Sequence, residues 1–317
     1  EKADVVQLWG SRGAGPDKMH GRYALTFQGQ AEVYAHPAPG PIQLSFEGAS
    51  NTSSGTIYYP INAANSFLAL RFSKTRRSQA SDLESGVSTI RIMRPVTPGS
   101  RRSYPASTVF HTPILDLIAK FSTIRYMDFL ATNWNRQKNW ADRMLPASPS
   151  YARSPPGHGW QGLGGPWEHV TLLSNRTGKD AWINLPVAAS DDYVRKVAQL
   201  LAYGSDGFVP YTAPQANPVY PPLDADIRIY VEFSNEVWNG SFSQMQDNCL
   251  AASDELVATS GATNLNWDGS WNGVPYGQAK WNWSFCSRRT TRRSIEISNI
   301  FRSVFGEAGL PQPPRQL

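Results

Sequence analysis

The chain has 317 residues, of which 40% are hydrophobic, so it is long enough for one large domain or two smaller ones with real cores. Its 30 basic and 25 acidic residues give a net charge of +5, but the arginine pairs are dispersed and follow no nucleic-acid-binding motif, so no nucleic-acid partner is expected. No apolar run has the length that crosses a membrane, so no membrane association is expected either.

Residues 1–80 have the pattern of a β-rich unit. Short apolar runs are separated by clusters of Gly, Pro, Asn and Ser, and they lie at 23–27, 31–34, 42–46, 56–59 and 67–72. Short strands with turn residues between them predict a small antiparallel, sandwich-like domain. Such a domain is either an ancillary sugar-binding module or a packing partner for the next domain, and the second alternative is favoured.

From Gly86 the pattern changes to alternating strands and helices, which predicts a parallel sheet in an α/β domain over residues 86–317. We expect four parallel strands in the order of the chain, at 87–94, 122–129, 180–186 and 227–234. Ser190 is expected to cap a helix over 191–203 that stops at Gly204. Further helices are predicted from Thr112, over 167–174 and over about 242–259 and 284–305.

A long loop, residues 131–166, follows the second of these strands. It is rich in Pro and Gly and contains Trp134, Trp140 and Trp160. Long loops without secondary structure are usually functional, and this one leaves the carboxyl end of a strand, where α/β barrels build their clefts. The chain has 11 Trp residues, and indole faces stack on sugar rings, so their abundance favours a carbohydrate ligand, although large cores also contain Trp.

The segment 226–239 carries the principal candidate site. Apolar residues alternate with polar ones up to Phe233, which predicts a strand, and Glu232 and Glu236 fall on or just beyond its polar face. Unpaired carboxylates are costly on a buried strand. Two of them therefore indicate either a structural ion pair or acid/base chemistry.

The ending Ser234-Asn235-Glu236-Val237-Trp238, after three earlier strand–helix units, resembles the fourth barrel strand of the clan A retaining glycoside hydrolases. The segments 125–129, 182–186 and 232–238 are also similar to secreted microbial glycosidase-like and cellulose-binding proteins. The resemblance implies a TIM-type (β/α)8 barrel in which Glu236 is the general acid/base and Asn235 holds the 2-hydroxyl of the sugar. The family's nucleophile follows its seventh strand, so we expect a first half-barrel, truncated before a fifth strand, with the nucleophile outside this chain.

Further residues are candidates for binding the substrate. Trp238, Trp134 and Trp160 follow strand ends and are expected to stack on sugars on the same side of the sheet as Glu236. Asp128 would orient or bind a sugar, with a loop-capping role as an equal alternative. Asn184 would bind a hydroxyl group, or else hydrogen-bond to the neighbouring strand.

Glu232 is expected to be a structural polar residue inside the barrel rather than a catalytic one. Glu232 precedes Glu236 on the same strand and therefore lies deeper in the sheet, where its partner would be Arg91, Arg94 or Arg125.

The cysteines and histidines give weaker signals. Cys249 continues the apolar stripe of a predicted helix, so a buried free thiol is favoured over a bridge to Cys286. The five histidines, at 20, 36, 111, 158 and 169, have no metal-ligand spacing, so neither a metal nor another cofactor is expected.

These observations favour a secreted, retaining glycoside hydrolase that uses two carboxylates on a polysaccharide or oligosaccharide and is inactive as this fragment. The alternative is a non-catalytic carbohydrate-binding protein on a barrel scaffold, because a fold does not guarantee chemistry.

Overall fold

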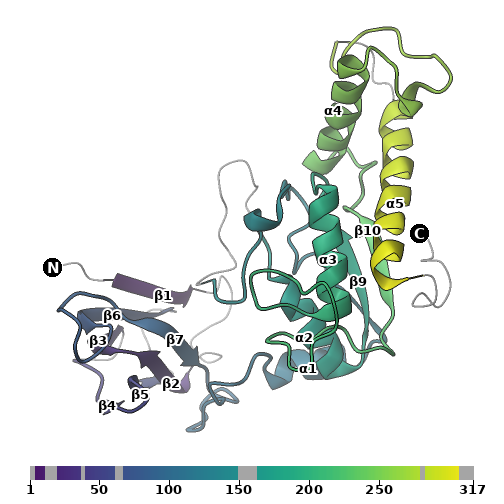
Figure 1. Cartoon of the computed structure of the whole chain (residues 1–317). Helices are drawn as coiled ribbons and strands as arrows, with labels where there is room; N and C mark the ends of the chain where they lie inside the picture. Colours follow the sequence, from purple (N-terminus) through teal and green to yellow (C-terminus); the bar gives the residue numbers. More distant parts are fainter. Residues whose placement is uncertain are drawn as a thin grey trace. The chain divides into compact units, whose positions relative to one another are not determined.

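The computed structural model describes residues 4–10, 20–36, 40–60, 67–148, 163–278 and 283–306. The chain divides into two compact units, Glu1–Leu117 and Ile118–Leu317, which are described separately (Figure 1). The short helix α1 (Thr112–Ile118) spans the boundary between them.

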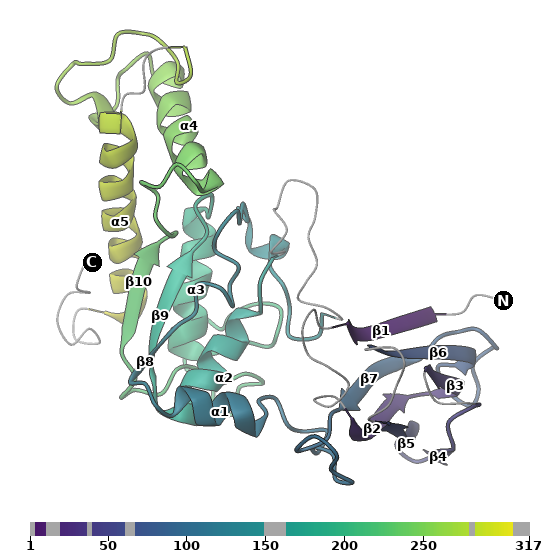
Figure 2. The ribbon, with the colours of Figure 1, turned by 180° about the vertical axis from the view of Figure 1, so that it is seen from behind.

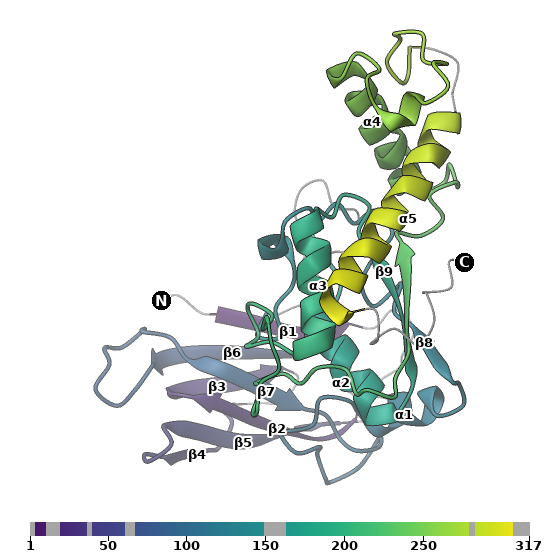
Figure 3. The ribbon, with the colours of Figure 1, turned by 45° about the vertical axis from the view of Figure 1, so that its right-hand side comes forward.

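The first unit consists of two antiparallel sheets that lie in adjacent layers (Figure 3). One sheet has the strand order β1 (Asp4–Gly10), β6 (Phe67–Arg76), β3 (Gln30–His36), and the other has the order β4 (Leu44–Glu47), β5 (Thr52–Tyr59), β2 (Gly21–Gln28), β7 (Ser88–Met93). Their inner faces share one core, in which Leu25 and Phe27 of β2 meet Leu70 and Phe72 of β6. The rings of Phe27 and Phe72 pack edge to face with centroids 5.4 Å apart.

Strand β7 corrects the expected assignment of residues 87–94 to the parallel sheet. It pairs antiparallel with β2, with Ile92 opposite Leu25 and Arg91 opposite Thr26. Ile92 packs against the core of this unit, whereas Arg91 is exposed. An antiparallel sheet typically has one apolar face and one solvent-exposed face, whereas the strands of a buried parallel sheet are apolar on both faces. The alternation of apolar and polar residues in β7 is therefore consistent with its position in an antiparallel sheet.

The second unit contains a parallel three-stranded sheet with the order β10 (Ile229–Phe233), β9 (Asp180–Leu185), β8 (Thr123–Arg125). Its helices are α2 (Trp167–Thr177), α3 (Asp191–Tyr203), α4 (Ser243–Ala258) and α5 (Trp283–Phe305), and two short 3-10 helices are η2 (Trp140–Asp142) and η3 (Asn264–Asn266).

The prediction of a half-barrel with four parallel strands is wrong. The strands expected second, third and fourth form an open sheet in that order, while the strand expected first belongs to the antiparallel sheet of the other unit. Among the described residues, the sheet of the second unit has three strands and does not close into a barrel.

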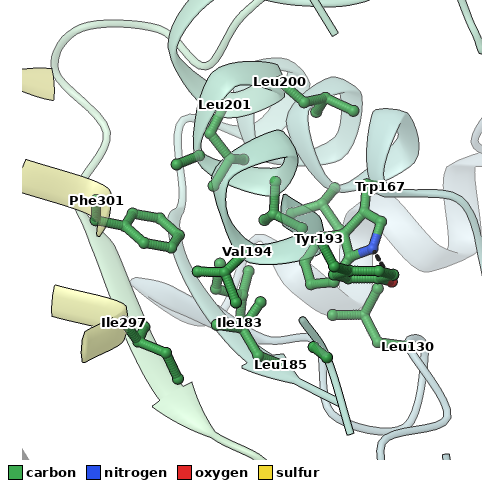
Figure 4. Close-up of a cluster of buried hydrophobic side chains, with 14 of the residues drawn as sticks. Leu130, Trp167, Ile183, Leu185, Tyr193, Val194, Leu200, Leu201, Ile297 and Phe301 are labelled. Carbon is green, nitrogen blue, oxygen red and sulfur yellow. Dashed lines mark hydrogen bonds between the residues drawn. The ribbon is translucent and has the colours of Figure 1, made fainter. Parts of the chain in front are cut away.

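The core of the second unit lies between the sheet and its helices (Figure 4). Ile183 and Leu185 of β9 are fully buried against Val194 of α3, and Ile297 and Phe301 of α5 join the same cluster. The sequence signals for α3 are confirmed, since the Ser190 side chain accepts a hydrogen bond from the Tyr193 backbone and the helix ends at Gly204. The opposite face of the sheet is seen in Figure 2.

The expectation of a free thiol at Cys249 is wrong. Cys249 of α4 and Cys286 of α5 form a disulfide, with Cα atoms 4.6 Å apart. The apolar stripe of α4 does place Cys249 in a buried position, as expected. The stripe could not show that α5 presents a second cysteine at the same contact, because that contact joins residues 37 positions apart.

Candidate functional site

The turn that follows β10 has an unusual backbone. Ser234 and Glu236 have φ angles of 57° and 44°, in the left-handed region that residues with a side chain seldom adopt. Asn235, between them, is 2% exposed, and the Ser234 N–H still donates to the Leu185 carbonyl of β9 at 2.9 Å. Strained backbone persists only where the surroundings fix it, and it is concentrated at functional sites.

The Asn235 side chain supplies that fixation. Arg125 donates to its amide oxygen at 3.0 Å, and its amide nitrogen donates to the Asn133 side chain at 2.9 Å. Gln244 of α4 donates both to the Asn235 backbone carbonyl at 2.8 Å and to Asn133 at 2.7 Å. Asn235 therefore ties the turn to β8, to the loop after β8 and to α4.

Glu232 is held by donors from the other two strands of the sheet. Its Oε2 accepts hydrogen bonds from Arg125 of β8 at 2.8 Å and from Trp182 and Asn184 of β9 at 2.9 and 2.6 Å. The Arg125 guanidinium also lies over the Trp182 ring, 4.6 Å from its centroid. Three donors on one oxygen fix the orientation of the carboxylate. The other oxygen, Oε1, has no hydrogen-bond partner among the described residues and remains available to a ligand.

A groove of about 360 Å³ runs between β10 and α5. Glu232, Glu236, Trp182 and Trp238 line it, and α5 contributes hydroxyl and apolar side chains, namely Thr290, Thr291, Ser294, Ser298, Ile297 and Phe301. Trp238 is 68% exposed. Glu236 is half-buried and accepts a hydrogen bond from the Asn239 side chain at 2.7 Å. The groove thus combines two carboxylates, an exposed indole and several hydroxyl groups.

The other candidate substrate-binding residues lie in different surroundings. Trp134 packs edge to face on Phe242 at 5.4 Å, and its backbone N–H donates to Gln244, so it lies beside the network around Asn235. Asn184 is buried and donates to Glu232 and to the Ser234 carbonyl. Asp128 is exposed in the turn after β8 and does not line the groove. Trp160 lies outside the described residues.

Of the three arginines proposed as partners of Glu232, Arg125 makes the contact. Arg91 and Arg94 belong to the first unit, where Arg91 donates to the Ala106 carbonyl at 3.0 Å. Their expected place depended on assigning residues 87–94 to the parallel sheet, and it is wrong for the same reason.

Sequence reasoning missed several residues of the site. Trp182 shares a strand face with Asn184, and strand periodicity could have found it. Asn133 and Gln244 lie in a loop and at the start of α4, and no periodic pattern marks them. The residues of α5 that line the groove were not predicted either, because the local sequence does not specify which face of a helix packs against the edge of a strand.

Comparisons with protein-family models, with curated proteins and with solved structures give no match for the chain. Within the described ranges, no group of three or more His, Cys, Asp or Glu side chains is arranged to hold a metal ion. No helix in this part of the chain is both long and apolar enough to cross a membrane.

Proposed function

We propose that the protein binds a polysaccharide chain in the groove between β10 and α5 and hydrolyses its glycosidic bonds, with Glu236 as the general acid/base. The observation that carries this proposal is that Glu236 and the exposed Trp238 line the same groove, next to a strained turn fixed by Asn235. Active sites of α/β proteins typically lie at the carboxyl ends of parallel strands, where this turn begins.

The chemistry of the groove suits a sugar. The Trp238 indole offers an apolar face to the C–H groups of a pyranose ring, and the hydroxyl side chains of α5 offer donors and acceptors to its hydroxyl groups. Glu236 would protonate the glycosidic oxygen and then deprotonate the attacking water. Glu232, held in place by three donors, would stabilise the positive charge that develops on the sugar in the transition state.

A second candidate function is carbohydrate binding without hydrolysis. Among the described residues, the groove contains no carboxylate besides Glu232 and Glu236, and Glu232 is tied down by Arg125, Trp182 and Asn184. A carboxylate that accepts three hydrogen bonds suits binding a sugar hydroxyl as well as it suits stabilising a cation. Trp238 serves both functions equally.

The test measures binding and hydrolysis separately. The wild-type chain and its Glu236→Gln and Trp238→Ala variants are assayed on a panel of soluble polysaccharides, by affinity electrophoresis and by release of reducing ends. Trp267→Ala is the matched control, because Trp267 is 75% exposed but does not line the groove. We expect Trp238→Ala to weaken binding roughly two- to tenfold and Trp267→Ala to leave it unchanged.

Glu236→Gln should retain binding and lower the rate of hydrolysis roughly 100- to 10,000-fold. An unchanged rate would show that Glu236 is not the acid/base. Binding that depends on Trp238 without any hydrolysis would establish the second candidate function. Binding that depends on Trp267 and not on Trp238 would exclude the groove.

A further inference from the structure

A separate cavity of about 240 Å³ lies where the start of α3 meets α4 and α5. Its charged lining consists of Arg289, Arg292 and Arg293 from α5, Glu296 from the next turn, Glu255 from α4 and Asp191 from α3. The three arginines have i, i+3 and i+4 spacing, so they project from one side of the helix. None of these residues lines the groove proposed for the glycan.

Two of the three arginines are neutralised by carboxylates. Arg292 binds both carboxylate oxygens of Glu255. Arg293 donates to Asp191 at 2.5 Å, to Glu296 at 2.9 Å and to the Ala189 carbonyl at 2.9 Å. Each carboxylate of the cavity is therefore already engaged by Arg292 or Arg293.

Arg289 is the exception. It is half-buried, and it donates to the side-chain oxygen of Asn248 at 2.7 Å. No carboxylate of the described residues forms an ion pair with it. Burial lowers the pKa of Arg289, and the nearby Arg293 and Arg292 lower it further, with a larger effect than the opposing one of Glu255 and Glu296. Among the three arginines of this cavity, Arg289 is therefore the one without a carboxylate partner.

We propose that Arg289 anchors a binding site for a compact oxyanionic group, such as a carboxylate, sulfate or phosphate. A guanidinium has five N–H donors in a planar fork that matches two oxygens of such a group, and Asn248 uses one of these donors. Leaving a partly desolvated cation without a counter-charge is costly, so an anion that enters the cavity gains both hydrogen bonds and charge compensation. The carboxylates around the cavity restrict the occupant to a small group that approaches Arg289 itself.

Neither Glu255 nor Glu296 serves as the counter-charge of Arg289. Glu255 is held on both oxygens by Arg292 and also accepts from Thr263, and Glu296 is shared between Arg293 and Arg292. Moving Glu255 to Arg289 would break its pairing with Arg292 through both oxygens, and moving Glu296 would break its ion pairs with Arg293 and Arg292. An external anion compensates Arg289 without that loss.

The test is a titration with sodium sulfate, sodium phosphate and sodium glucuronate, followed by thermal unfolding and calorimetry, at an ionic strength kept constant with sodium chloride. The glucuronate distinguishes an acidic sugar from a free inorganic ion. We expect saturable stabilisation of the wild-type chain by at least one of the three anions, with a Kd on the order of 1 mM. Arg289→Gln should bind this anion about 10- to 100-fold more weakly, because a charged hydrogen-bond donor is lost.

Arg288→Gln is the matched control, since Arg288 precedes Arg289 on α5 but pairs with Asp268 and does not line the cavity. It should bind the anion as the wild type does. Arg289→Lys keeps the charge without the fork and should bind with intermediate affinity, which provides a second variant if Arg289→Gln does not fold. The absence of saturable binding in the wild type, or equal binding by the wild type and the folded Arg289 variants, would overturn the proposal.

Discussion

The buried ion pair between Arg143 and Glu168 gives the sharpest test of what holds the second unit together. Arg143 follows η2, and Glu168 lies in the first turn of α2. Their side chains are 1% and 0% exposed and are joined by two parallel hydrogen bonds of 2.9 and 2.8 Å. Ser205 donates a further hydrogen bond to Glu168 at 2.9 Å, and the Arg143 guanidinium lies over the Trp140 ring.

Replacing either partner of this ion pair should lower the free energy of unfolding. Glu168→Gln keeps the shape of the side chain but leaves the Arg143 charge buried, so we expect a loss of about 3–5 kcal/mol in the free energy of unfolding. Arg143→Met should cost more. It leaves the Glu168 charge uncompensated, and it also removes the Arg143 donors to the backbone carbonyls of Met144 and Gly207. A buried carbonyl that loses its donor costs about 1–3 kcal/mol.

The assay is urea denaturation followed by near-ultraviolet circular dichroism, with hydrogen exchange of α2 to assign the change to the second unit. The control is Lys196→Met, which breaks the exposed Lys196–Asp192 pair on α3 and should cost about 0.5 kcal/mol or less. The Arg143→Met/Glu168→Gln double variant should lose less than the sum of the two single losses. Single losses below about 1 kcal/mol that add without coupling would refute the reasoning, because such a pair would behave like a surface ion pair.

The Cys249→Ala/Cys286→Ala variant should lose about 4 kcal/mol of stability from the 37-residue separation of the bridge, and reductant should destabilise the wild type but not the variant in thermal unfolding. Burial lowers the pKa of His169 to about 4, below its value of about 6.5 in an unfolded chain, so the neutral form stabilises the fold. The stabilisation is complete above pH 6.5, and the free energy of unfolding should decrease by up to about 3 kcal/mol as the pH falls to 4. In urea titrations at several pH values, His169→Asn should reduce this dependence on pH. Ser190→Ala should cost about 1 kcal/mol by removing the N-cap of α3, and an unchanged urea midpoint would count against that role.

The parts of the fold that could be predicted from the sequence are those with local signals. Helix α3 begins after Ser190 and ends at Gly204 because a capping side chain and a glycine mark its ends. Strands β9 and β10 lie within the predicted ranges 180–186 and 227–234 and are parallel neighbours, as expected. Strand β8 is shorter than the predicted 122–129, because the chain turns after Arg125.

The errors concern contacts between distant segments. Residues 88–93 do form a strand, but its alternation does not specify whether it pairs with Gly21–Gln28 or with Thr123–Arg125. Pairing is decided by which partner buries Ile92, and this information lies in the other strand. The same limitation applies to the Cys249–Cys286 bridge and to the groove, since both require knowing which side of α5 faces inward.

The polar face of the parallel sheet is the feature that most needs a functional explanation. Strands of a parallel sheet are usually apolar on both faces, but Trp182 and Asn184 of β9 lie in register with Tyr230 and Glu232 of β10 on one face. Replacing this carboxylate and its donors by apolar residues would spare the cost of desolvating them. The carboxylate is instead held in one orientation by groups from all three strands, and one of its oxygens is left available in a groove that also contains Glu236. Such an arrangement gives up stability to fix a charge in place, which is what a binding or catalytic site requires and a structural core does not.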